Sequence, residues 1–92
     1  MKNAHRNIGR SPFPLGEIRI AASAKRRVSH GDMDAGLRRH AQCDWGELTP
    51  EEWATNDANL SAGHRLLSAY RAASGCAFWV ITDYDRRSTT VF

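Results

Sequence analysis

The sequence has little cysteine, little proline and no long hydrophobic run. Two cysteines and three prolines occur in its 92 residues. The cysteines stand 33 positions apart (76 − 43), which does not form a disulfide framework in a chain without a secretory leader. No stretch approaches the roughly 18 apolar residues that cross a bilayer, and the first residues lack the apolar segment of a secretory signal. We therefore expect neither a membrane-spanning protein nor a secreted domain held by disulfides.

The composition is that of a small globular domain. Apolar residues make up 41% and charged residues 25% of the chain, which weighs 10.3 kDa. A chain of this size forms one domain, buries roughly 60–65% of its unfolded surface, and has room for one modest core and one exposed site. Gly9, Pro12 and Pro14 indicate an irregular basic arm over 1–14. Residues 15–92 are predicted to form the domain.

Charge is distributed unevenly along the chain. Residues 1–40 hold nine Lys or Arg against three Asp or Glu, a balance of +6, whereas 41–92 hold four against seven, a balance of −3. The densest basic group indicates a polyanion or an acidic protein as partner, and it comprises Lys25, Arg26, Arg27, Arg38 and Arg39. Every charged residue within 44–57 is acidic, namely Asp44, Glu47, Glu51, Glu52 and Asp57. This stretch would repel phosphate on its own face, and it could imitate phosphates in a nucleic-acid channel.

The first half of the chain predicts one strand and one helix. Apolar and polar residues alternate over 16–22, as in a half-buried strand. A helical turn follows over 23–28, until His30-Gly31 breaks it. Asp32 or Asp34 can then cap a helix that reaches about Gln42. The apolar face of this helix is predicted to hold Met33, Leu37, His40 and Ala41.

The second half predicts a helix and three strands. Thr49 to Glu52 has the pattern of a capping box with proline at the first helical position, so a helix is expected from Pro50 to about Ser61, closed by Gly63. Strands are expected over 64–71, 76–82 and 88–92, with the middle one central because it is apolar on both faces. The fold class is therefore α+β, a small antiparallel sheet in the order β-α-α-β-β-β with two helices on one face.

No constellation of residues favours catalysis, a metal or a cofactor. His40 and Cys43 with His64 and Cys76 have the residue types of a zinc site, but no closely spaced cysteine pair is present. Cys43 beside His40 and Asp44 also lists the parts of a cysteine nucleophile, although neighbours three apart on a helix rarely face a common substrate. We therefore expect a buried, hydrogen-bonded His40, no catalytic residue and no cofactor.

Two further groups of residues have alternative interpretations. Asp83 and Asp85 flank a turn and could hold a magnesium ion in a nuclease, or simply cap the turn. Among the aromatic residues, Phe78 and Trp79 are predicted to lie in the core. Trp45 and Tyr84 lie in charged loops and are the better candidates for an exposed contact.

Three strings together resemble a known family. They run from Arg39-His40 to Leu48, from Arg65 to Tyr70, and from Trp79 to Val91. Their order and spacing are similar to those of a family of small proteins, about ninety residues long, from plasmids, prophages and integrative elements, often labelled restriction-enzyme subunits. The resemblance covers 16–92 and implies a mobile-element accessory protein in a bacterial cytoplasm, with no established activity. The chain departs from the family at Cys43, where glycine is usual, over Ser23 to Arg26, and in stopping at Phe92.

The sequence leads to two main hypotheses of function. The first is a non-enzymatic protein that binds and inhibits a host defence nucleoprotein complex of the CRISPR or restriction type. The second is a small basic regulator that binds nucleic acid directly; a small nuclease is a third hypothesis. A homodimer is also expected, through a sheet edge ending at Phe92. The predicted interface residues are Lys25, Arg26, Arg27, Arg38, Arg39, Asp44, Trp45, Glu47, Glu51, Glu52, Tyr84, Asp85 and Arg86.

Overall fold

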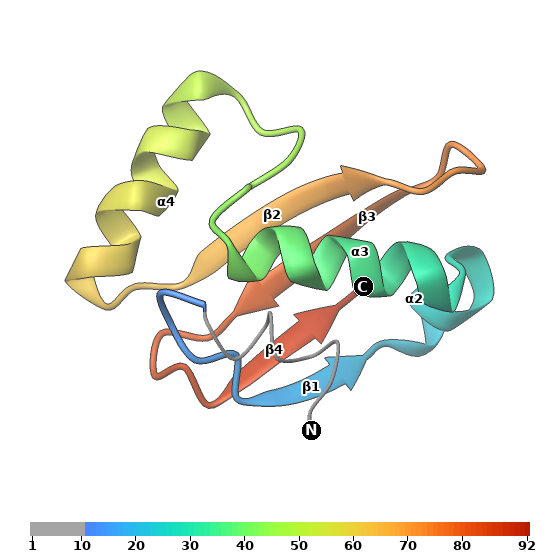
Figure 1. Ribbon diagram of the computed structural model, residues 1–92, viewed down its shortest axis with the longest axis horizontal. Coiled ribbons are helices and arrows are strands. Elements are labelled where there is room, and N and C mark those ends of the chain that lie inside the picture. The colour runs from blue at the N-terminus through green and yellow to red at the C-terminus, as the bar shows by residue number, and fades with distance from the viewer. Residues whose placement is uncertain (1–10) are drawn as a thin grey trace.

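A computed structural model describes residues 11–92, which form an α+β fold around one four-stranded sheet (Figure 1). The strands are β1 (Glu17–Ile20), β2 (Leu66–Arg71), β3 (Ala77–Thr82) and β4 (Ser88–Val91), in the spatial order β1-β4-β3-β2. This confirms the fold class and the inner position of β3. The sheet is mixed, however, because β1 pairs parallel with β4 while the other two pairings are antiparallel.

Within 11–92 three helices accompany the sheet: α2 (Ala22–Arg27), α3 (His30–Ala41) and α4 (Pro50–Ala62). Figure 1 shows α3 lying across one face of the sheet, with α2 at one end of it and α4 beside β2. The expected turn over 23–28 is thus a short helix. The predicted break at His30-Gly31 is wrong, because α3 starts there with Ser29 as its N-cap. Asp32 instead accepts a hydrogen bond from the Ala73 backbone N–H.

The beginning and end of α4 follow the predicted signals. The Thr49 hydroxyl accepts a hydrogen bond from the Glu52 N–H at 3.1 Å, and the Glu52 carboxylate accepts one from the Thr49 N–H at 2.8 Å. Pro50 occupies the first turn, and Gly63 ends the helix with a positive φ of 76°. The capping box is therefore confirmed, and local sequence alone accounts for both ends of this helix.

The core consists of two clusters of buried side chains on the α3 side of the sheet. One gathers Met33, Leu37, Tyr70, Phe78 and Val80 with neighbours from α2 and β4. The other comprises Phe13, Leu15, Ala41, Trp45 and Leu66, with Trp53 packed against it. Residues 11–14 of the predicted arm therefore supply a core side chain, Phe13. The rest of that predicted arm, residues 1–10, lies outside the described residues.

The two outer strands differ in what covers them. On β2, the Ala69 backbone accepts a hydrogen bond from the Glu47 N–H and donates one to the Trp45 carbonyl. Beside it, the Asn56 side chain from α4 bonds both the N–H and the C=O of Leu67, as a neighbouring strand would. The edge expected at Phe92 is not an edge, because β4 lies between β1 and β3. Within 11–92 the uncovered outer strand is β1.

Glycine is required at position 46 by this arrangement. Gly46 has a φ of 76° and approaches Ala69 so closely that a Cβ would overlap the Ala69 carbonyl and the Tyr70 ring. Its N–H also donates to the Asp44 carboxylate at 3.1 Å. The residue predicted only as a helix breaker thus lets the loop lie against β2.

Among the described helices none is long and apolar enough to cross a membrane.

We expect Asn56→Ala to destabilise the fold by about 1–3 kcal/mol, because it leaves the Leu67 backbone groups without their partner. Urea denaturation measures this change. Thr55→Ala is the matched control: Thr55 is exposed on the same helix, its hydroxyl donates to the Glu51 carbonyl within that helix, and its loss should cost less than about 0.5 kcal/mol. Equal losses for the two variants would show that the Asn56 amide does not stabilise this strand.

Candidate functional site

A chain of buried hydrogen bonds passes through His40. Its Nδ1 lies 2.5 Å from the Ser68 hydroxyl, and its Nε2 lies 2.8 Å from the Thr82 hydroxyl. The Thr82 and Thr89 hydroxyls are 2.7 Å apart, and Thr89 donates to the Leu15 carbonyl at 2.7 Å. The three hydroxyl groups and His40 are all fully buried.

The direction of each bond in this chain follows from proton counting. A carbonyl only accepts, so the Thr89 proton goes to Leu15, and Thr89 must accept from Thr82. Thr82 must then accept from His40, which fixes the proton on Nε2. Nδ1 is left to accept from Ser68. A single neutral tautomer of His40 therefore satisfies every group, and the ring has no free nitrogen for a substrate or a metal.

The electrostatics agree with a neutral imidazole. Burial, together with the nearby charge of Arg86, lowers the pKa of His40 to about 3. This agrees with the expectation of a buried, hydrogen-bonded histidine. Sequence reasoning missed its partners Ser68, Thr82 and Thr89. Their signal was a polar residue at the inward position of each of three strands.

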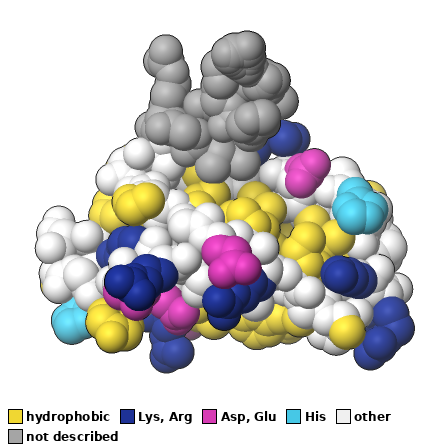
Figure 2. Space-filling model, turned by 90° about the horizontal axis from the view of Figure 1, so that it is seen from below, with side chains coloured by type: hydrophobic (Ala, Val, Ile, Leu, Met, Phe, Trp, Pro, Cys, Tyr) yellow, Lys and Arg dark blue, Asp and Glu magenta, His cyan; other side chains and the backbone are white. Residues whose placement is uncertain are grey.

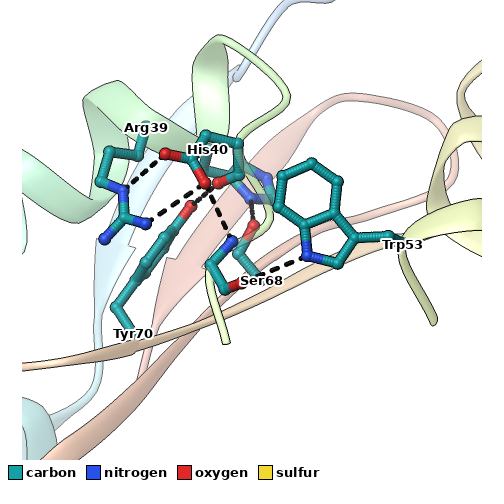
Figure 3. Close-up of polar contacts among 7 residues, drawn as sticks. Arg39, His40, Trp53, Ser68 and Tyr70 are labelled. Carbon is teal, nitrogen blue, oxygen red and sulfur yellow. Dashed lines mark hydrogen bonds and ion pairs between the residues drawn. The ribbon is translucent and has the colours of Figure 1, made fainter. Parts of the chain in front are cut away.

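The loop after α3 is held by Asp44, whose partners Arg39 and Tyr70 are labelled in Figure 3. Its carboxylate accepts bonds from the Arg39 guanidinium at 2.8 and 3.2 Å, and its carbonyl accepts one from the Tyr70 hydroxyl at 2.6 Å. Arg39 also lies over the Tyr70 ring. Its guanidinium lowers the pKa of Asp44, and burial raises the pKa of Tyr70. Trp53 donates from Nε1 to the Gly46 carbonyl. Arg39 and Asp44 thus have a structural use.

The other acidic residues of 44–57 mostly serve the fold as well. Glu47 pairs with Arg71 at 3.3 Å, Glu52 completes the capping box, and Asp57 accepts from Trp45 Nε1 at 3.0 Å. Glu51 is exposed, and its side chain makes no hydrogen bond or ion pair with the part of the chain described. Little of the acidic stretch is therefore left as a free row of carboxylates.

The predicted basic group is divided between two places. Lys25, Arg26 and Arg27 lie on α2. Arg38 lies on α3, about 12 Å along the helix axis from its first residue, His30. Arg27 donates to the Ala77 carbonyl at 2.8 Å. Lys25, Arg26 and Arg38 are exposed, and none forms an ion pair with any residue of 11–92. These three cations remain available to a partner.

The turn before β4 holds the remaining predicted residues. Arg86, at a positive φ of 61°, donates to the His64, Asp83 and Asn59 carbonyls. Its guanidinium also lies over the buried Phe13 ring. Asp85 accepts from the Arg87 N–H. Tyr84 is 69% exposed, as expected. The acids in this turn thus bond the turn itself.

No three His, Cys, Asp or Glu side chains within 11–92 come close enough to share a metal ion. Both cysteines are free and half-buried, and burial raises the pKa of Cys43. Cys43 has a φ of 64°, a conformation that glycine adopts without strain. This explains in physical terms why glycine would suit the position.

Two tryptophans exchange the places predicted for them. Trp45, expected at an exposed contact, is fully buried because its ring packs against Phe13 and His40. Trp79, expected in the core, is 38% exposed on the sheet face away from α3, where its ring stacks on Phe92. Alternation along β3 sends Phe78 and Val80 inward, and Trp79 must then point outward.

Comparisons of this chain with protein-family models, curated proteins and solved structures find no match.

The His40 chain gives a pH dependence. Folded His40 stays neutral down to about pH 3, whereas the unfolded imidazole takes up a proton below about 6.5. The unfolded state binds more protons between these values, so we expect the free energy of unfolding to fall by about 1.4 kcal/mol per pH unit from pH 6 downward. Urea denaturation against pH measures the slope, with His40→Gln lacking this contribution. Imidazole ¹⁵N shifts that show protonated His40 in folded protein at pH 5 would contradict it.

Proposed function

We propose that this chain is a non-enzymatic accessory protein of a bacterial mobile element that acts in the cytoplasm. It binds a host defence nucleoprotein complex, of the CRISPR or restriction type, and inhibits it. The resemblance over 16–92 motivates the setting. The mode of binding is a contact between the cations of α2 and the nucleic acid of that complex.

This mode of binding rests on one observation: most acidic side chains of 44–57 are bonded within the fold, whereas the cations of α2 are largely not. Asp44, Glu47, Glu52 and Asp57 are engaged in internal bonds, which favours a structural use over imitation of phosphate. Lys25 and Arg26 have no such engagement in residues 11–92. Exposed cations of this kind contribute to binding chiefly through phosphate contacts and counterion release.

A second candidate is a basic regulator that binds nucleic acid without a protein partner. The free cations favour it equally, and the two candidates differ in what is recovered with the protein. Inhibition of a complex requires that the complex itself be bound and slowed, whereas a regulator needs only nucleic acid.

We expect tagged protein to recover a defence complex from host lysate, and to slow target cleavage by that complex after purification. Lys25→Glu/Arg26→Glu should weaken both about tenfold, because two phosphate contacts become repulsions. Mass spectrometry, with and without nuclease treatment, and a cleavage assay measure this.

The matched control is Arg65→Glu/Arg87→Glu. It changes the net charge equally at two exposed arginines, at the far end of the sheet from α2. Unchanged cleavage at excess wild-type protein would overturn inhibition. Recovery of nucleic acid alone would favour the regulator. Equal loss in both double variants would assign the effect to net charge instead of α2.

A further inference from the structure

The sheet face opposite α3 has no helix over it among the described residues. Side chains on β2 and β3 alternate between buried positions toward α3 and more exposed positions on this other face, where β4 places the half-buried Thr90. We call the latter the open sheet face, and it includes Trp79, Phe92, Ile81, Thr90, Arg19 and Arg71. On this face Trp79, Arg19 and Arg71 are exposed, and Phe92, Ile81 and Thr90 are half-buried.

An aromatic pair lies at one end of this face. Trp79 and Phe92 exchange two backbone hydrogen bonds, so they are directly opposite each other on neighbouring strands. Their rings stack with centroids 5.9 Å apart and planes 25° from parallel. On the other side of Trp79 its neighbour is the small residue Ala69. A flat ring is therefore presented beside another ring, with only a small side chain directly opposite it on β2.

Cations surround this pair. Arg19 on β1 and Arg71 on β2 stand on the two outer strands. Three strand spacings, about 14 Å, separate them across the sheet, and Arg71 also lies four residues (71 − 67) further along, because Arg19 is level with Leu67. Both are in exposed ion pairs, with Glu17 and Glu47. Such pairs contribute little, so the guanidinium groups can exchange a carboxylate for a phosphate.

The helix α2 adjoins the same end of the sheet. Its preceding residue, Ala21, donates to the Val91 carbonyl next to Phe92, and Arg27 bonds Ala77, two residues before Trp79. The helix α2 therefore lies at the end of the sheet that holds the aromatic pair, with its buried Ala24 in the core on the α3 side and Lys25 and Arg26 exposed. Figure 2, which views the molecule from the β1 side, shows Lys and Arg side chains along this side, with Asp, Glu and hydrophobic side chains among them.

From this placement we propose that the open sheet face binds single-stranded nucleic acid. Bases stack on Trp79 and Phe92, and phosphates contact Arg19, Arg71 and the cations of α2. Stacking needs unpaired bases, which a duplex does not offer, and it tolerates any sequence because every base has a π face. The site rests on the nucleic-acid contact of the proposed function and specifies the form of nucleic acid.

The test is fluorescence anisotropy of labelled oligothymidine, oligouridine and a DNA duplex with the purified full chain at low salt. We expect single strands to bind more tightly than the duplex. Trp79→Ala should weaken single-strand binding about tenfold and Phe92→Ala about fivefold, while Trp79→Phe should restore most of the affinity. Ile18→Ala is the matched control, because it removes an exposed apolar side chain from β1 at a position level with inward-facing Thr89, and it should change binding by less than about twofold. Urea denaturation checks that each variant folds.

Several outcomes would overturn the stacking site. They are no single-strand binding by the wild type, a preference for duplex, or equal effects of Trp79→Ala and Ile18→Ala. A concentration-dependent dimer that Trp79→Ala abolishes, measured by sedimentation without nucleic acid, would assign the face to a second copy. Duplex binding that is lost in Lys25→Glu/Arg26→Glu but not in Trp79→Ala would leave the proposed function standing and remove this site. Single-strand binding without any effect on a defence complex would support this site and overturn the proposed function.

Discussion

The buried chain from Ser68 through His40, Thr82 and Thr89 to Leu15 is the constraint on which the rest of the structure depends. It ties α3 to three strands and to the segment before β1. A polar group left unpaired in such a place costs far more than a paired one gains, so every member must be in position at once. The same bonds that hold the core together remove His40 from chemistry, and this directs attention to the surface.

The loop from Cys43 to Leu48 connects α3 with α4 and packs against β2. Asp44 organises it from within, Gly46 allows its approach, and Trp45 enters the core behind it. Together with Asn56 this loop covers the outer side of β2. Edge strands are prone to pair with other chains, and here one edge is protected by backbone bonds and a side-chain amide. The acidic character of the segment is thus largely a consequence of structure.

Exposed cations remain on α2 and on the open sheet face, which also holds an exposed tryptophan, and the two arginines of that face are in exposed ion pairs with Glu17 and Glu47. Arg39 and Arg86 bond the fold, but α2 and the open sheet face keep theirs toward solvent. Polyanion binding needs charge that is not already neutralised, and base stacking needs a ring that is not already enclosed. Both conditions meet at one end of the sheet, which is why the two proposals concern neighbouring surfaces.

Local signals in the sequence determined much of this structure. The capping box at Thr49, the glycine after α4 and the alternation in β3 act over a few residues, so they could be recognised directly. The parallel pairing of β1 with β4, the burial of Trp45 and the exposure of Trp79 could not. Each depends on which distant segment lies opposite: β3 is apolar on both faces, and only its partners decide which face becomes core. The sequence alone determined most of the helices and strands and the burial of His40. Only the tertiary structure decided which aromatic rings and charged side chains remained exposed to a partner, because burial depends on packing between residues that are remote in the sequence.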